Sequence, residues 1–129
     1  MVKTAKQKLG EWGEEQTCSF LVRQCYKIVM RNYRVDLDWV KGEIDIIAID
    51  PDGVLCFVEV KTRGSGEGSA ERATSFEKKV GKIKNVAIQY CVDNNIDVDR
   101  TKMKLEHVSV YFSRSEKKVD FKKYVLEVC

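Results

Sequence analysis

The sequence predicts an α/β or α+β domain in which a central mixed β-sheet is flanked by helices in three layers. Small and apolar residues recur at helical spacing near the N-terminus and again in a segment that starts near Ala73. The segments between and after these helices are rich in β-branched and aromatic residues, which favour strands. At 129 residues the chain has the length of a single domain, residues 1–129, that can hold its own core.

The first helix is expected over residues 4–24. Its inward stripe consists of Leu9, Gly13, Thr17 and Leu21. Glu14 borders this stripe. Glycine inside a helix costs about 1 kcal/mol relative to alanine. The presence of Gly10 and Gly13 beside one glutamate therefore predicts the close approach of another backbone.

The remaining elements alternate between strands and one more helix. A strand is expected within residues 26–35, and a two-stranded hairpin within residues 42–63. The stretch RGSGEGSAER, residues 63–72, is expected to form a flexible rim of a cleft. A long helix follows, with Thr74 and Glu77 as a capping box. Further strands are expected at residues 105–112 and 119–128.

The composition is that of an ordinary soluble protein, with 43% hydrophobic and 33% charged residues. The net charge of +3 permits a polyanionic partner without requiring one. Lysines cluster in EKKVGKIK and SRSEKKVDFKKY, so that one face could be strongly positive. Each cluster alone fits a solvated surface equally well.

Cysteine usage and hydropathy point to a location inside the cell. The five cysteines are an odd number without CxxC spacing, which predicts buried free thiols in a reducing compartment and no disulfide or zinc framework. The N-terminus lacks the apolar core of a signal peptide, and no segment is long and apolar enough to span a bilayer. We therefore expect a cytoplasmic protein without a membrane partner.

The turn of the hairpin fixes the register of its strands. Its sequence, DPDG at residues 50–53, fits a type I turn with Pro51 second and Gly53 in the left-handed conformation. Counting outward from a pairing of Asp50 with Val54 gives one face with the pairs Ile49–Leu55, Ile47–Phe57, Asp45–Glu59 and Glu43–Lys61. A two-residue loop would shift the register by one residue and separate the two acidic side chains.

In this register Asp45 and Glu59 face each other with Cβ atoms about 4.5–5.5 Å apart, which is unfavourable for like charges. A hard divalent cation such as Mg²⁺ or Mn²⁺ would bridge them, because it prefers oxygen ligands and retains waters for chemistry. Lys61 would stand beside the ion, Glu43 would hold the lysine, and Glu14 would complete the cluster from the first helix. The alternative is a surface hairpin with one salt bridge and two solvated carboxylates.

Asp45, followed after thirteen residues by Glu59-Val60-Lys61, resembles the D...ExK signature of restriction-endonuclease-like nucleases. The longer strings GEIDIIAID and FVEVKTR, preceded by GEWGEE and RNYR, resemble the YraN-like family of small bacterial proteins. That family is described as predicted endonucleases related to archaeal Holliday-junction resolvases. The resemblance extends over about residues 10–110.

The resemblance implies a restriction-endonuclease-like domain with a mixed sheet flanked by helices, and it implies a role for each site residue. Asp45 and Glu59 would be metal ligands, joined by the main-chain carbonyl of Val60 and supported by Glu14. Lys61 would be the third signature residue, acting on the phosphate or on the attacking water.

The function expected on this basis is Mg²⁺- or Mn²⁺-dependent hydrolysis of DNA, including DNA at branched structures. Lys78, Lys79 and Lys82 of the second helix, with Arg63 after the hairpin, would grip phosphates. A non-catalytic nucleic-acid-binding module is the alternative, and an RNA substrate remains open. The sequence also leaves open whether the protein forms a homodimer, as junction-cutting nucleases often do.

Other chemistries find little support. His107 is the only histidine and has no histidine or cysteine partner at ligand spacing, which argues against a zinc site or a histidine-based triad. We expect it on the surface of the sheet. Trp12 and Trp39 could stack on bases, but packing is the commoner role of tryptophan.

Overall fold

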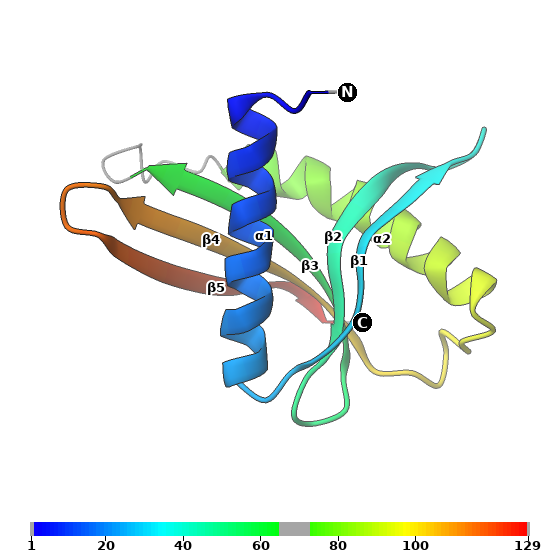
Figure 1. Cartoon of the computed structure of the whole chain (residues 1–129). Coiled ribbons are helices and arrows are strands. Elements are labelled where there is room, and N and C mark those ends of the chain that lie inside the picture. The colour runs from blue at the N-terminus through cyan, green and yellow to red at the C-terminus, as the bar shows by residue number, and fades with distance from the viewer. Residues whose placement is uncertain (1, 65–72, 129) are drawn as a thin grey trace.

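Within residues 2–64 and 73–128, which the structure describes, the chain forms two helices and five strands. For residues 73–79 this computed structural model describes the backbone alone. The elements, shown in Figure 1, are α1 (Ala5–Arg23), β1 (Lys27–Asp36), β2 (Lys41–Ile49), β3 (Leu55–Gly64), α2 (Ala73–Asp93), β4 (Met103–Ser113) and β5 (Lys118–Val128).

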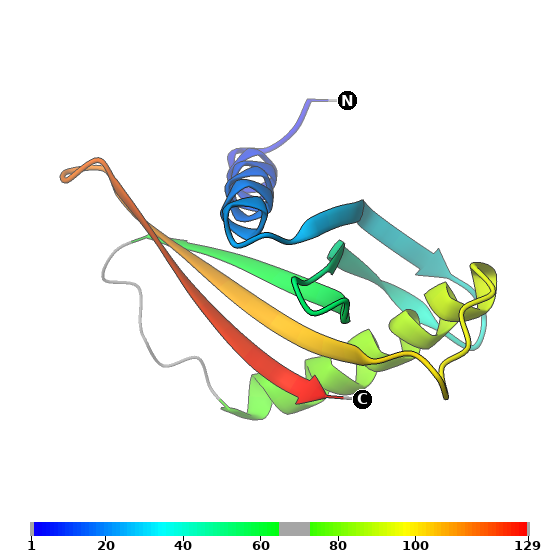
Figure 2. The ribbon, with the colours of Figure 1, turned by 90° about the horizontal axis from the view of Figure 1, so that it is seen from below.

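The described strands form one sheet in the order β1-β2-β3-β4-β5. Neighbouring strands are antiparallel except β3 and β4, which are parallel because the crossover through α2 returns the chain to the same end of the sheet. Figure 2 shows α1 on one face of the sheet and α2 on the other. The predicted three-layer α+β arrangement with a mixed sheet is therefore confirmed.

Each face of the sheet carries its own core. The α2-side core includes Ile44, Ile47, Leu55, Phe57, Ile83, Val86, Tyr90 and Leu105. The α1-side core includes Leu21, Tyr26, Ile46, Ala48, Cys56, Val58, Val108 and Val110. Both faces of β2 and β3 are covered next to the hairpin turn, and the strand segments there, residues 46–49 and 55–58, are apolar throughout.

The turn of the β2–β3 hairpin has the predicted form. Gly53 has a φ of +82°, and its N–H donates to the carbonyl of Asp50 at 3.0 Å. The Asp50 carboxylate accepts hydrogen bonds from the backbone N–H groups of Asp52 and Val54, each at 2.9 Å. The ladder that follows contains the predicted pairs Ile49–Leu55, Ala48–Cys56, Ile47–Phe57 and Ile46–Val58.

Helix α1 begins with a capping box, and the side of the helix that carries its small residues contacts the sheet. The Thr4 hydroxyl accepts from the Gln7 N–H at 3.1 Å, and the Gln7 side chain accepts from the Thr4 N–H at 2.9 Å. Gly13, Thr17 and Leu21 are buried, as the predicted stripe requires. The neighbour of Gly13 is the Thr62 side chain of β3, however, and not a backbone as the sequence suggested.

We expect Gly13→Ala to lower the free energy of unfolding by about 1–3 kcal/mol, because the new Cβ would collide with the Thr62 side chain. This cost outweighs the gain in helix propensity of about 1 kcal/mol. Gly10→Ala is the matched control, since a Cβ there meets no atom within 4 Å and keeps the gain. Urea unfolding measures both variants. A Gly13→Ala protein as stable as wild type would contradict this packing.

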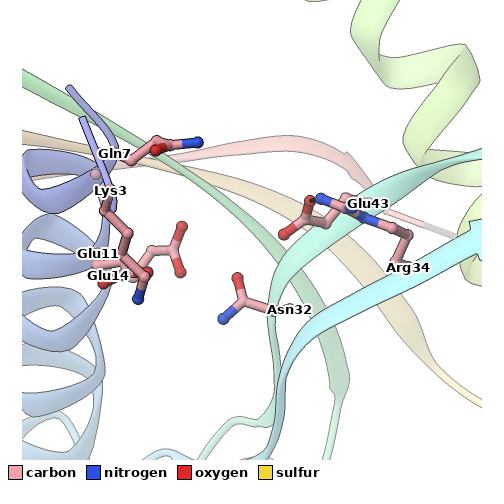
Figure 3. A pocket seen from close by; sticks show the side chains of 8 residues that line it. Lys3, Gln7, Glu11, Glu14, Asn32, Arg34 and Glu43 are labelled. Carbon is pink, nitrogen blue, oxygen red and sulfur yellow. Dashed lines mark hydrogen bonds and ion pairs between the residues drawn. The ribbon is translucent and has the colours of Figure 1, made fainter. Parts of the chain in front are cut away.

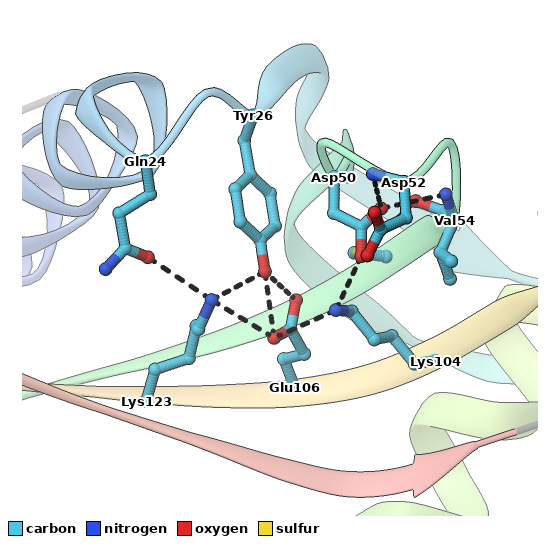
Figure 4. Close-up of polar contacts among 9 residues, drawn as sticks. Gln24, Tyr26, Asp50, Asp52, Val54, Lys104, Glu106 and Lys123 are labelled. Atoms are coloured by element: carbon cyan, nitrogen blue, oxygen red, sulfur yellow. Dashed lines mark hydrogen bonds and ion pairs between the residues drawn. The ribbon is translucent and has the colours of Figure 1, made fainter.

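A buried polar network lies at the other end of the α1-side core, near the hairpin turn (Figure 4). The Glu106 carboxylate is fully buried, accepts from the Tyr26 hydroxyl at 3.0 Å, and has Lys123 and Lys104 at 3.7 and 3.8 Å. Lys104 also pairs with Asp50 at 2.7 Å. Burial alone would raise the pKa of Asp50, but the hydrogen bonds from Lys104 and from the turn amides hold it below its usual value.

Removing the hydroxyl of Tyr26 should destabilise the protein by roughly 1–3 kcal/mol, because a fully buried carboxylate would lose a donor. Tyr33→Phe is the control, since its hydroxyl donates at 2.9 Å to an exposed carboxylate, that of Asp93, which water can solvate instead. There we expect a loss below about 1 kcal/mol. Thermal and urea unfolding of both variants provide the comparison. Equal losses of stability in the two variants would show that the burial of Glu106 does not increase the cost of removing its hydrogen-bond donor.

The described cysteines 18, 25, 56 and 91 have free thiols, as predicted. Cys56 and Cys91 are buried, but Cys25 is exposed in the turn after α1, so the expectation of burial is wrong for that residue. Cys129 lies outside the described residues. Neither α1 nor α2, the helices in the described part of the chain, is long and apolar enough to cross a membrane.

Candidate functional site

Strands β2 and β3 part at the predicted site. The ladder ends at the pair Ile46–Val58, and the Asp45 carboxylate accepts a hydrogen bond from the Val60 N–H at 2.8 Å. The expected direct pairing of Asp45 with Glu59 is therefore wrong. In a regular strand, side chains on one face are separated by even numbers of residues. Ile44 and Ile47 both lie in the α2-side core, so this alternation is broken at Asp45.

Asp45 nevertheless lies at the centre of an acidic group. Burial, together with the nearby charges of Glu14, Glu59 and Glu43, raises the pKa of its carboxyl to about 7, although the hydrogen bond from the Val60 N–H acts in the opposite direction. Within the described residues, no basic side chain pairs with Asp45. The structure thus brings together acidic side chains from α1, β2 and β3, all of which the sequence had singled out.

Glu14 projects from α1 toward β1 and β2 in a pocket of about 500 Å³ (Figure 3). Its carboxylate lies 3.7 Å from Arg31. With its amide nitrogen facing the carboxylates, Asn32 donates to Glu14 at 2.9 Å and to Glu43 at 3.0 Å. Burial raises the pKa of Glu14, although the Arg31 charge opposes this shift. Asn32 thereby ties the helix to β2 beside Asp45.

Glu43 and Lys61 do not form the predicted pair. Glu43 instead pairs with Arg34 on the neighbouring strand β1 at 2.8 Å, because the strands that carry Glu43 and Lys61 have separated. Lys61 is exposed on β3, two residues beyond Glu59 and on the same face of that strand. The lysine is therefore open to solvent beside the acidic group.

His107 is a neighbour of the site, and its predicted position is wrong. It is 1% exposed, not on the surface of the sheet, and its Nδ1 lies 3.5 Å from the Glu59 carboxylate. Its Nε2 lies 2.9 Å from the Ser109 hydroxyl. The parallel register pairs Glu59 of β3 with His107 of β4. Alternation along β4 from Leu105 could have placed this histidine on the α2-side face.

The donor groups at this position suit a hard cation. As they stand, no three histidine, cysteine or acidic side chains within the described ranges could together hold a metal ion. Mg²⁺ commonly uses only one or two carboxylates, with waters in its other positions. Asp45 and Glu59 are the two carboxylates that could bind such an ion here, and the Val60 hydrogen bond keeps the backbone of β3 against Asp45.

The four basic residues predicted to grip phosphates are only partly described. Lys82 is exposed on α2, and Arg63 is half-buried near the end of β3. The side chains of Lys78 and Lys79 lie outside the described residues, as do the Thr74–Glu77 capping box and residues 65–72 of the predicted flexible rim. Of the two tryptophans, Trp12 packs edge-on against Phe112, whereas Trp39 is 75% exposed.

Residues 13–114 match the model of a family described as "Uncharacterised protein family UPF0102". A UPF0102 protein of Desulforamulus reducens is 33% identical over 110 residues, which cover 84% of this chain and 85% of that protein. One from Alkaliphilus oremlandii is 36% identical over 114 residues, or 88% and 92% of the two chains. One from Prosthecochloris aestuarii is 38% identical over 92 residues, or 70% and 68%.

Proposed function

The chain belongs to the UPF0102 family, and we propose that it is a metal-dependent endonuclease that hydrolyses DNA phosphodiester bonds at Asp45 and Glu59. The observation that carries this proposal is the environment of the Asp45 carboxyl group. A largely buried carboxyl with a pKa of about 7, near three further carboxylates and without a basic partner in the described part of the chain, is costly to ionise. A divalent cation would offset this cost.

The resemblance of Asp45 and Glu59-Val60-Lys61 to the D...ExK signature supports the same proposal and suggests a restriction-endonuclease-like site, of the kind found in junction resolvases. When bound, Mg²⁺ or Mn²⁺ would neutralise nonbridging phosphate oxygens and lower the pKa of a bound water. Asp45, Glu59 and the Val60 carbonyl would hold the ion, with Glu14 as support. The free thiols of the described cysteines fit a cytoplasmic protein.

Lys61 would act on the substrate itself. Its ammonium group is exposed on the same face as Glu59, so it can contact the phosphate or orient the attacking water. Asn32 and Arg31 would keep Glu14 in place through the contacts described above. His107, beside Glu59 and shielded from solvent, would restrict the positions open to that carboxylate.

A nicking assay tests the proposal with supercoiled plasmid, linear duplex, single strands and four-way junctions, in Mg²⁺ or Mn²⁺ and in EDTA. We expect cleavage that requires the metal and that falls by about 100-fold or more in Lys61→Met. Lys27→Met, a change of the same kind at an exposed lysine on the distant edge strand β1, should cleave like wild type. Cleavage in EDTA, or equal rates for both variants, would contradict the assignment. Salt-sensitive binding without cleavage of any substrate would point to a non-catalytic binding module.

A further inference from the structure

We propose that the α2-side face of β3, β4 and β5, beyond Glu59 and Lys61, binds single-stranded DNA. We call this surface the tyrosine–lysine track and define it by four residues, namely Lys61, Tyr111, Lys122 and Tyr124. The inference deepens the proposed function and rests on it, because the track starts at the candidate site. Most of its residues lie on β4 and β5, outside the set of basic residues predicted to grip phosphates.

The strand registers place the track beside the site. Across the sheet, Glu59 is level with His107 and Tyr124, and Lys61 is level with Ser109 and Lys122. Residues level with one another on neighbouring strands project from the same face. Lys61 and Lys122 therefore lie on one face, two strand spacings or about 10 Å apart.

Two exposed or partly exposed tyrosines flank the lysines. Tyr124 is 43% exposed, and its ring lies 6.2 Å from the ring of His107. Tyr111 is partly exposed, and the Lys122 ammonium group lies 5.7 Å from the centre of its ring. Tyr111 is four residues from His107 on β4, so the two tyrosines lie about 13 Å apart along the strands. Exposed or partly exposed aromatic rings and lysines on one sheet face are a combination that binds bases and phosphates together.

The chemistry favours a single strand over a duplex. Aromatic side chains stack on bases only where the base faces are accessible, whereas duplex DNA offers its phosphates to lysines without exposing those faces.

Lys118 adds further positive charge near the tip of the β4–β5 hairpin, although Asp120 lies 3.9 Å from it. The hairpin extends beyond the rest of the sheet in Figures 1 and 2. Strand β5 also lies outside the region that matches the family, so the track would be particular to chains with this strand.

Binding of a labelled 20-nucleotide oligo-dT, followed by fluorescence anisotropy in EDTA, tests the track without any cleavage. We expect Tyr124→Leu to weaken binding roughly 5- to 150-fold and Tyr124→Phe to bind like wild type, because stacking needs the ring and not the hydroxyl. Lys122→Gln should weaken binding and reduce the slope of log affinity against log salt by about 0.7. Lys27→Gln, on the far edge strand, is the matched control and should change neither.

Melting curves of each variant establish that the fold is retained, and Lys122→Gln keeps the test decisive if Tyr124→Leu unfolds. Unchanged binding in both Tyr124→Leu and Lys122→Gln would overturn the track. Equal affinity for a duplex of the same length, with no effect of Tyr124→Leu, would also overturn it and would indicate a backbone-binding surface. Because the assay contains no metal, a protein that binds here but never cleaves would refute the nuclease and leave the track standing, and the reverse result would refute the track alone.

Discussion

Asp45→Asn should be more stable than wild type at pH 8 in EDTA, by roughly 2–4 kcal/mol. Burial raises the pKa of Asp45 to about 7, well above the usual value for an unfolded chain. Between these two pKa values the folded protein binds a proton that the unfolded chain does not. The wild-type stability should therefore fall as pH rises from about 4 to about 7 and should stay low above that range. Asparagine has no charge to bury and keeps an oxygen acceptor for the Val60 N–H.

Urea unfolding between pH 5 and pH 8, with and without Mn²⁺, measures this effect. The advantage of Asp45→Asn should shrink toward pH 5, and Mn²⁺ should stabilise wild type but not the variant, because only wild type offers the second carboxylate. Asp36→Asn is the control, since the side chain of Asp36 is 81% exposed. A variant less stable than wild type at pH 8 in EDTA would show that the ionised Asp45 is favourably paired in the folded protein.

Glu59→Gln should lower the rate of DNA cleavage by about 1,000-fold or more, which corresponds to about 4 kcal/mol of transition-state stabilisation. The amide is nearly isosteric with the carboxylate but is neutral and a poor ligand for a hard cation. Stability should change little, because Glu59 is partly exposed. The loss should appear mainly as weaker apparent metal affinity, so that higher Mn²⁺ concentrations restore part of the rate.

Two further substitutions on α1 calibrate this result. Glu14→Gln should reduce cleavage less than Glu59→Gln, because Glu14 reaches the site from the helix and is held there by Asn32. Glu15→Gln changes a neighbouring exposed glutamate and should have no effect. If Glu59→Gln cleaved at the rate of Glu15→Gln, the residue would have no part in catalysis.

The sequence was sufficient to predict the fold and the hairpin register close to the turn. The strands form at the expected residues because alternation and turn chemistry are local signals, and Gly53 with Pro51 selects one loop length. The predicted register is wrong at Asp45, where the alternation of side chains along β2 is broken. No local sequence pattern indicates this break, because Ile44 and Ile46 are equally apolar although they pack on opposite faces of the sheet.

Tertiary contacts explain the other differences. Asn32 has a φ of +53°, a conformation that asparagine tolerates better than most residues, and it bridges Glu14 and Glu43. The sequence could not indicate this bridge, since it joins segments that meet only after α1 packs against β1 and β2. Tertiary contacts also explain why Glu43 pairs with Arg34 and not with Lys61.

Crystals soaked in Mn²⁺ and measured for anomalous scattering test most directly whether Asp45 and Glu59 share a cation. We expect one strong peak within bonding distance of both carboxylates, and we expect this peak to be lost in crystals of Glu59→Gln. A manganese peak at another position, or carboxylates that remain metal-free at saturating Mn²⁺, would contradict this expectation.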